Sequence, residues 1–380
     1  MITFETGPIR PPSEATSILL RLTRNCHWNK CSFCPVYKEE GFSIRKVNEI
    51  KRDIDAMASV ADKIRQRMNV PRNAGVDRAA VIDAVTSLDG DGEVDGECAR
   101  QMAFWMCHGL QNVFLQDADA LVLRTEQLVD ILNHLRAAFP TIKRITSYAR
   151  SKTISRKSPD ELKALRAAGL NRIHTGMESG SNAILSLFHK GVTQEEQIRS
   201  GRNVVAADIE LSEYFMPGLG GRELSQEHAV ESAAVLNAVN PTFIRLRSTI
   251  PVPGTPLHHM MTEGQWTPLT EEEKVREIKT FLEHLDGITS TVQSDHIMNL
   301  LEDVAGKLPN DRKLILEPID RFLNMTPSDR ESFIVGRRMG KFRLVGDYVP
   351  SPDVEMVRRD LIERFGTVDK GVLKILVNFI

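Results

Sequence analysis

Three cysteines stand close together near the start of the chain, with a spacing that suits a metal cluster. They are Cys26, Cys31 and Cys34, in a C-x4-C-x2-C pattern that follows the apolar residues 17–23. Thiolates are the usual protein ligands of iron–sulfur clusters, and a four-iron cluster held by three of them leaves one iron open. The pattern therefore predicts a [4Fe-4S] cluster with one coordination site available to another molecule.

A structural zinc site is the alternative interpretation of the same cysteines. Zinc sites normally close with four Cys or His ligands, and His27 could supply the fourth. Because His27 directly follows Cys26, the two would bind one ion with poor geometry, which favours the iron–sulfur cluster. The remaining cysteines, Cys98 and Cys107, are too few to hold a second cluster by themselves.

Composition excludes several classes of protein. The 380 residues include 49 Lys and Arg against 51 Asp and Glu, a net charge of −2, so no nucleic-acid surface or polybasic membrane anchor is indicated. No apolar run approaches the roughly 18 residues that would span a bilayer. The first residues lack the features of a signal peptide. We therefore expect a cytoplasmic protein whose clustered cysteines bind metal rather than form disulfides.

Strand-like and helix-like segments alternate along most of the chain. The expected strands are 17–23, 113–116, 144–148, 172–176, 210–215, 243–249 and 288–292, with helices at 125–138, 159–168, 194–207, 227–239 and 270–285. Repeated strand–helix units build parallel sheets. The predicted fold class is α/β, a partial (β/α) TIM-type barrel of parallel strands with function at their carboxyl ends.

Two parts of the chain stand outside this alternation. Residues 71–109 predict a helical insertion within a barrel domain at 1–300. Residues 301–380 predict a mostly helical C-terminal extension, with one short β-like piece at 342–345. Additions of this kind around the mouth of a barrel commonly set specificity, so both are expected to contribute to the substrate pocket.

Polar residues and glycines gather at the ends of the expected strands. They are Gln116, Asp117, Asp119, Glu178, Ser179, Gly218, Gly220, Arg245, Arg247 and His296, with Lys190 beyond the next helix. Each has a structural alternative. An Asx turn could explain 117–119, the arginines could point outward, and Ser294 or Asp295 could cap a helix at 299–304 with His296 packed on its first turn.

The order of these segments resembles the radical S-adenosylmethionine superfamily, in its oxygen-independent coproporphyrinogen oxidase-like and methylthiotransferase-like branch. The matching pieces are Ser32-Phe33-Cys34, Gly176-Met-Glu178-Ser-Gly180 and Pro253-Gly-Thr-Pro-Leu257. Two features depart from the family pattern. The first cysteine spacing is x4 rather than x3, and no Gly-Gly-Glu follows the second strand.

The resemblance implies a cofactor pair, a [4Fe-4S] cluster and S-adenosyl-L-methionine. Cys26, Cys31 and Cys34 would hold the cluster, and its open iron would chelate the methionine end. Reductive cleavage would then yield a 5'-deoxyadenosyl radical that abstracts hydrogen from the substrate. A flavodoxin or ferredoxin-type protein would supply the electron, and the substrate would be a small molecule.

The same resemblance distributes roles among the strand-end residues. It implies that Gln116, Asp117 or Asp119 binds the amino group, that Glu178 lies near the ribose and amino-acid portion, and that Gly218 and Gly220 pack near the adenine. Ser179, Lys190 and Arg245 are further candidate cofactor-binding residues, and Arg245 could meet the cofactor carboxylate. From their positions at strand ends, His296 and Arg247 are the candidate catalytic residues and substrate contacts, and His296 beside Asp295 could supply acid/base chemistry. Methylation, dehydrogenation, rearrangement and ring formation remain open as outcomes. A non-catalytic iron–sulfur or zinc-binding redox or scaffold protein is the alternative function.

Overall fold

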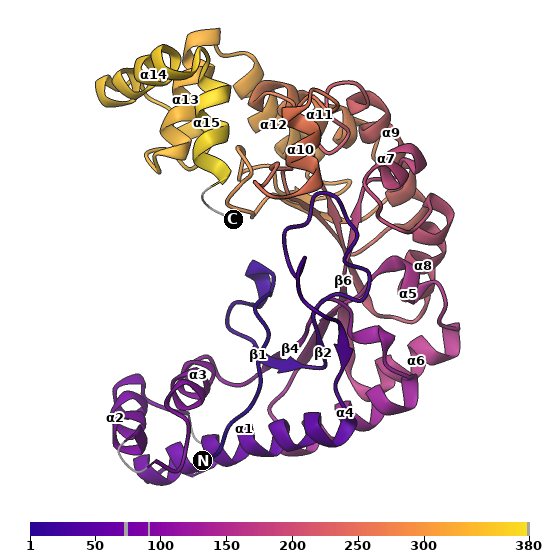
Figure 1. The fold of residues 1–380 in the computed structure, drawn as a ribbon, viewed down its shortest axis with the longest axis vertical. Helices are drawn as coiled ribbons and strands as arrows, with labels where there is room; N and C mark the ends of the chain where they lie inside the picture. Colours follow the sequence, from indigo (N-terminus) through magenta and orange to yellow (C-terminus); the bar gives the residue numbers. More distant parts are fainter. Residues whose placement is uncertain (72–74, 90–91, 378–380) are drawn as a thin grey trace. The chain divides into compact units, whose positions relative to one another are not determined.

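The computed structural model describes residues 1–71, 75–89 and 92–377 (Figure 1). Its main sheet has eight strands in the order β1-β4-β5-β6-β7-β8-β9-β10. Their bounds are β1 (Ile18–Arg21), β4 (Asn112–Gln116), β5 (Arg144–Tyr148), β6 (Leu170–Glu178), β7 (Glu210–Phe215), β8 (Phe243–Leu246), β9 (Thr291–Gln293) and β10 (Gly306–Lys307). The pairs β1–β4, β4–β5, β5–β6, β7–β8 and β8–β9 are parallel, whereas β10 runs antiparallel to β9. This sequential order is that of a (β/α) barrel and confirms the predicted fold class.

The chain divides into two compact units, each described by itself. The first comprises Met1–His27, Glu39–His174 and Ala206–Glu210, and the second Trp28–Lys38, Thr175–Val205 and Leu211–Ile380. A short antiparallel pair, β2 (Thr23–Arg24) and β3 (Ser43–Ile44), belongs to the first unit. The predicted domain division after residue 300 is not tested by this partition and stays a prediction.

The first unit is rich in helices, of which the longest, α1 (Val47–Met68), is amphipathic. The others are α2 (Arg78–Asp89), α3 (Gly96–Cys107), α4 (Thr125–Ala138), α5 (Ser151–Ile154) and α6 (Pro159–Ala168). In α1, the buried Ile50, Ile54, Met57 and Ile64 recur every three to seven residues and form one apolar face. That face explains why the insertion, whose α2 and α3 both contact α1, folds as helices. Positions 72–74 and 90–91 of the predicted insertion lie outside the described residues.

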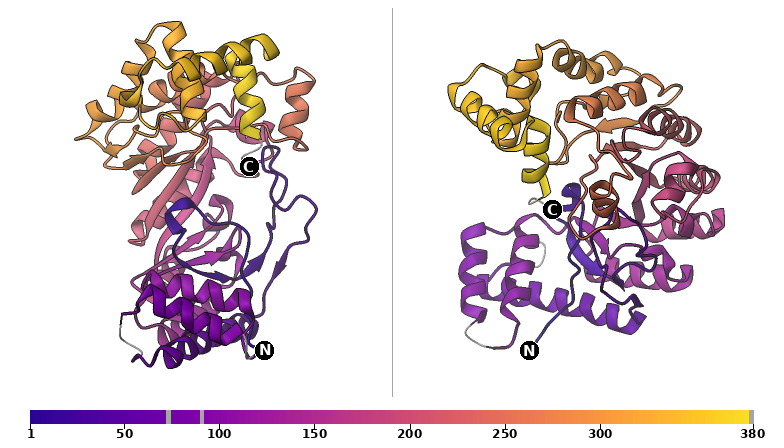
Figure 2. Two further views of the ribbon diagram at one scale, coloured as in Figure 1. Left: turned by 90° about the vertical axis from the view of Figure 1, so that its left-hand side faces the viewer. Right: turned by 45° about the horizontal axis from the view of Figure 1, so that its top comes forward.

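The second unit continues with helices α7 (Asn182–Leu187), α8 (Gln194–Ala206), α9 (Ser225–Val239), α10 (Pro256–Thr262) and α11 (Glu271–Glu283). The extension adds α12 (Arg312–Leu323), α13 (Pro327–Arg338), α14 (Pro352–Phe365) and α15 (Val368–Leu376), drawn in orange to yellow in Figure 2. The prediction of a mostly helical extension is confirmed.

Aromatic rings stack within the largely aliphatic core of this unit. Phe215 of β7 stacks on Phe281 of α11 with ring centroids 4.0 Å apart. The β-like piece predicted at 342–345 is wrong, because Phe342 packs on the rings of Phe333 and Tyr348 instead of pairing in a sheet. No helix in the described part of the chain is long and apolar enough to cross a membrane.

Candidate functional site

The cysteine motif lies on a loop whose second half is a tight turn. Cys34 donates its backbone N–H to the carbonyl of Cys31 over 3.3 Å. All three motif cysteines are partly exposed and none is in a disulfide. Among the residues that the structure describes, no three His, Cys, Asp or Glu side chains are grouped as metal ligands. Three thiols within nine residues are chemically suited to bind an iron–sulfur cluster. In the described part of the chain, the three side chains are not already arranged around one point as ligands.

Hydrogen bonds fix the part of the loop that carries Cys31 and Cys34. Trp28 Nε1 donates to the carbonyl of His189 over 2.6 Å. Ser32 donates its backbone N–H to Phe188 and accepts one from Leu257, both over 3.0 Å. The loop is therefore held by the segment after α7 and by the start of α10.

Apolar packing also holds the loop. Phe33 packs against the buried cluster of Ile184, Phe188, Met216, Leu219, Leu257 and Trp266. Gly191 has a φ of +70°, and a Cβ there would lie 2.2 Å from the Trp28 ring. Only glycine accommodates both the left-handed backbone and the close indole.

Glu178 sits at the end of β6 and forms an ion pair with Lys190 over 3.0 Å. Its φ is +62°, a left-handed conformation that is unusual for a residue with a side chain. A Cβ on Gly176 would lie 2.2 Å from Glu178 Oε1, so a larger residue there would displace this carboxylate. Lys190 Nζ also lies 5.8 Å from the centroid of the Phe33 ring. Lys190 thus connects the end of β6 with the residue before Cys34.

A second carboxyl near this pair was not found from the sequence. Glu213 of β7 is buried and accepts a hydrogen bond from the Thr175 hydroxyl. Burial raises the pKa of Glu213 to about 7, and the nearby Glu178 charge acts in the same direction. The sequence does contain one indication of this carboxyl. Glu213 is two residues from both Leu211 and Phe215, so it lies on the same face of the strand as these apolar side chains.

The hydroxyl of Ser179 is hydrogen-bonded to other groups of the protein. Its Oγ lies 2.9 Å from His228 Nδ1 and accepts the backbone N–H of Ser181 over 3.1 Å. His228 Nε2 lies 3.0 Å from the carbonyl of Met216, so this nitrogen carries the ring hydrogen. Burial lowers the pKa of His228 to about 4, and the neutral imidazole joins the ends of β6 and β7.

The predicted glycines follow β7. Gly218, with a φ of +85°, donates its N–H to Glu277 Oε1 over 2.6 Å. Burial raises the pKa of Glu277 to about 7. Gly218 also lines a cavity of about 410 Å³ together with residues that include Trp266 and Lys274. Gly220 packs closely on Ile184, where a Cβ would lie 3.0 Å from Cδ1.

Of the three residues predicted to bind the amino group, two are engaged within the first unit. The Gln116 amide exchanges hydrogen bonds with the backbone of Gly7. Asp117 forms an ion pair with Arg21 over 2.6 Å.

Asp119 is the third of these residues. It accepts a hydrogen bond from Thr153 over 2.5 Å, while its buried Oδ1 has no hydrogen-bond partner among the described residues. Burial raises the pKa of Asp119 to about 6. Asp119 directly precedes the short 3-10 helix Ala120–Val122 without a capping hydrogen bond from its side chain, and the Asx-turn alternative for 117–119 stays open.

Arg245 lies within β8, and Arg247 lies one residue beyond its end. Arg245 pairs with Asp295 over 2.6 Å and donates to Ser212 Oγ over 3.2 Å. The side chain of Arg247 has no hydrogen bond or ion pair with any residue in the described ranges.

His296 does not lie on a helix. The helix expected at 299–304, which Ser294 or Asp295 would cap, is wrong. Asn299 is instead buried and hydrogen-bonded to Ser248, to the carbonyl of Leu246 and to Ser294 Oγ, which ties this segment to the end of β8.

Comparisons with known proteins give partial matches. No family model matches the chain. It is 25% identical over 122 residues to a tRNA uridine(34) acetyltransferase of Methanocaldococcus infernus, covering 32% of this chain and 23% of the relative. It is 26% identical over 184 residues to a biotin synthase of Porphyromonas gingivalis, covering 48% of this chain and 51% of the relative. The chain thus matches about a quarter to a half of the length of these curated relatives.

Solved structures resemble the chain at low sequence identity. Methylornithine synthase (PylB) has a TM-score of 0.42 at 13% identity, covering 90% of this chain and 86% of that one. The radical S-adenosylmethionine methyltransferase TsrM from Kitasatospora setae, with cobalamin and a [4Fe-4S] cluster bound, has a TM-score of 0.43 at 16% identity, covering 64% and 36%. The archaeal Elp3 of M. infernus has a TM-score of 0.41 at 16% identity, covering 64% and 58%.

Proposed function

We propose that this chain is a radical S-adenosylmethionine enzyme. The observation that carries the proposal is the packing of the Cys31–Cys34 turn against the segment with Lys190, which pairs with Glu178 at a strand end. When bound, the cluster and S-adenosylmethionine supply one-electron cleavage of a sulfonium and hydrogen abstraction from a substrate. The chain's own residues bind and orient both molecules and exclude water.

Particular residues fit particular parts of the cofactor. Cys26, Cys31 and Cys34 would ligate iron. Asp119 is the best acceptor for the ammonium group, because its buried Oδ1 lacks a partner among the described residues. Glu178 would accept hydrogen bonds from ribose hydroxyls while Lys190 holds its carboxylate in place.

Gly218 and Gly220 would allow close approach of backbone to the adenine. Arg245 would face the methionine carboxylate, and Asp295 fixes its guanidinium.

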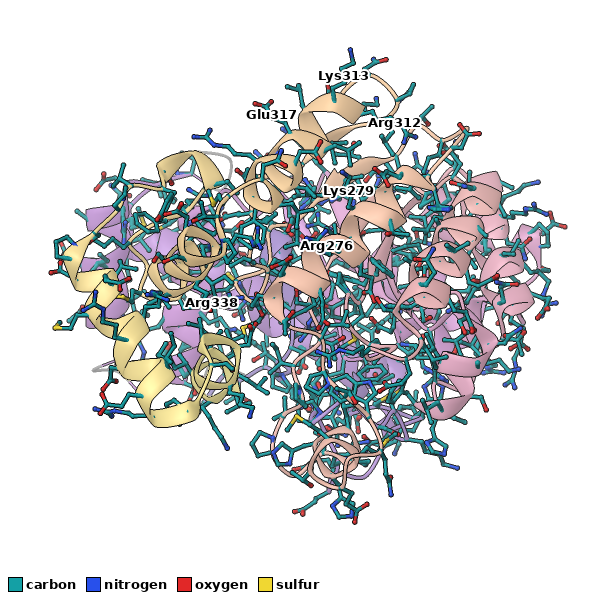
Figure 3. All side chains as sticks on the ribbon, turned by 90° about the horizontal axis from the view of Figure 1, so that it is seen from above. Arg276, Lys279, Arg312, Lys313, Glu317 and Arg338 are labelled. Carbon is teal, nitrogen blue, oxygen red and sulfur yellow. The ribbon has the colours of Figure 1, made fainter. Side chains whose placement is uncertain are left out.

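A small-molecule substrate is favoured over a nucleic acid, although one relative acts on tRNA by its name. Figure 3 labels basic side chains of α11 and α12, where an anionic polymer could bind. Arg276 is paired with Glu272 over 2.6 Å and Lys279 with Asp320 over 2.7 Å, which reduces their attraction for phosphates. A flavodoxin or ferredoxin-type electron donor and a cytoplasmic location stay predictions.

The proposal is tested by anaerobic reconstitution with iron and sulfide. We expect a brown protein that, after reduction, cleaves S-adenosylmethionine to 5'-deoxyadenosine. Alanine at Cys26, Cys31 or Cys34 should abolish iron binding, because two thiolates cannot hold the cluster. Cys107→Ala is the matched control and should keep full iron content.

Two results would contradict the proposal. A colourless protein with stoichiometric zinc would support the non-catalytic alternative. A cluster-loaded protein that forms no 5'-deoxyadenosine would place the chain among iron–sulfur proteins of another function.

A further inference from the structure

The ends of β7, β8 and β9 bring several polar side chains to one face. Parallel register pairs Tyr214 with Arg245, and Arg245 with Gln293. The ladder continues past Leu246, since Arg247 donates its backbone N–H to Phe215 over 3.0 Å. Side chains two residues apart share a face, so Arg247 lies on the face of Arg245, level with the residues that follow β9.

The two arginines differ in what they contact. Arg245 is buried, and its charge is offset by Asp295 at 2.6 Å. Arg247 is exposed, and its side chain has no ion pair or hydrogen bond with any described residue. Because the charges of Arg245 and Asp295 offset each other, the positive charge of Arg247 remains uncompensated by any described residue that it contacts.

His296 adds a directed donor beside this charge. The backbone N–H of Met298 donates to His296 Nδ1 over 3.3 Å, which leaves the hydrogen of the neutral ring on Nε2. Arg338 of α13, labelled in Figure 3, holds the loop by donating to the carbonyls of Ile297 at 3.4 Å and Met298 at 3.1 Å.

Electrostatics are consistent with this arrangement. Burial and the Arg247 charge lower the pKa of His296 to about 4, against an opposing effect of Asp295. Arg245, Arg247, Asp295 and Glu178 also act on the half-buried Tyr214, whose pKa desolvation raises to about 12. At neutral pH the group of side chains therefore presents donors and a net positive charge.

We propose that Arg247 and His296 bind an anionic group of the substrate, a carboxylate or a phosphate. The guanidinium offers two parallel N–H donors and His296 Nε2–H a third. This inference rests on the proposed function for its assignment to the substrate. An anion bound here would add negative charge beside the imidazole and stabilise its protonated form.

The test uses the 380-residue chain, reconstituted with iron and sulfide and carrying labelled histidines, with inorganic phosphate and acetate as probes. We expect NMR titration to show the pKa of His296 rising from about 4 toward its ordinary 6.5 on anion binding. Arg247→Gln should weaken anion binding about tenfold, the loss typical of one charge-assisted hydrogen bond. Arg276→Gln, which removes an exposed arginine on α11, should leave it unchanged.

Further measurements distinguish the possible occupants. If S-adenosylmethionine displaces the probe anion, the subsite belongs to the cofactor carboxylate and the substrate assignment is overturned. Simultaneous binding of the probe anion and S-adenosylmethionine supports the assignment of this subsite to the substrate. An unchanged His296 signal at high anion concentration also overturns the inference. Failure to form 5'-deoxyadenosine with anion binding intact would count against the proposed function alone, leaving the anion subsite standing.

Discussion

At the scale of single residues, the candidate site is a set of charges held by fixed partners. Lys190 fixes Glu178, Asp295 fixes Arg245, and Asp119 keeps one buried oxygen without a hydrogen bond among the described residues. The sequence identified these positions because each lies within or just after a strand, near its carboxyl end. It could not assign their partners, since Lys190 and Asp295 are distant from them in the chain.

Glu178→Gln should weaken S-adenosylmethionine binding about tenfold while leaving iron content intact. The amide keeps the size of the side chain but loses the charge that orients Lys190 and accepts hydroxyl donors. Calorimetry on reconstituted protein measures the affinity. The control is Glu195→Gln, an exposed acid of α8. Equal affinities for the Glu178 variant and wild type would place this carboxylate outside the cofactor site.

At the scale of elements, strands and helices were predictable because their apolar periods are long and regular. The parallel alternation and the helical extension followed from that pattern. Short pieces without a period were not predictable. Residues 342–345 carry a β-like composition, but ring packing of Phe342 decides their conformation. Likewise, Asn299 makes tertiary hydrogen bonds where the local pattern indicated a helix.

Gly191→Ala tests whether the segment after α7 positions the cysteine loop. The methyl group would lie 2.2 Å from the Trp28 ring, and we expect the loop to shift and iron incorporation to fall severalfold. Gly264→Ala is the matched control, since its φ of +72° imposes the same backbone strain of about 1 kcal/mol in open space. The iron content after reconstitution measures the effect on the cysteine loop, and urea unfolding measures the effect of backbone strain on stability. Equal iron loss in both variants would assign the effect to strain rather than to Trp28.

At the scale of the whole molecule, stability should depend on the proton content of buried groups. His228 has its pKa lowered to about 4 from 6.5, so between these values the unfolded chain binds more protons than the folded one. The free energy of unfolding therefore rises with pH across this interval, and His228 should cost about 2 kcal/mol at pH 5 relative to pH 7.

Replacing this histidine isolates its contribution. His228→Gln retains a donor for Met216 and an acceptor for Ser179 but does not titrate. Urea unfolding at both pH values should show a smaller loss on acidification in the variant than in wild type. Glu277, whose carboxyl is 4.0 Å from the ring and has a raised pKa, acts with the opposite sign and remains in both proteins. Parallel pH profiles would show that the imidazole titrates normally in the folded chain.

The contacts that Lys190 makes with Glu178 and Phe33 have a kinetic consequence. The ammonium group of Lys190 lies against the Phe33 ring and pairs with Glu178. A molecule that engages Glu178 also restrains Lys190, and through Phe33 the residue next to Cys34. The effect of bound S-adenosylmethionine on the release of iron can then be measured. A chelator should strip iron more slowly from protein preincubated with S-adenosylmethionine, and Lys190→Met should erase that protection even where the starting iron content is full.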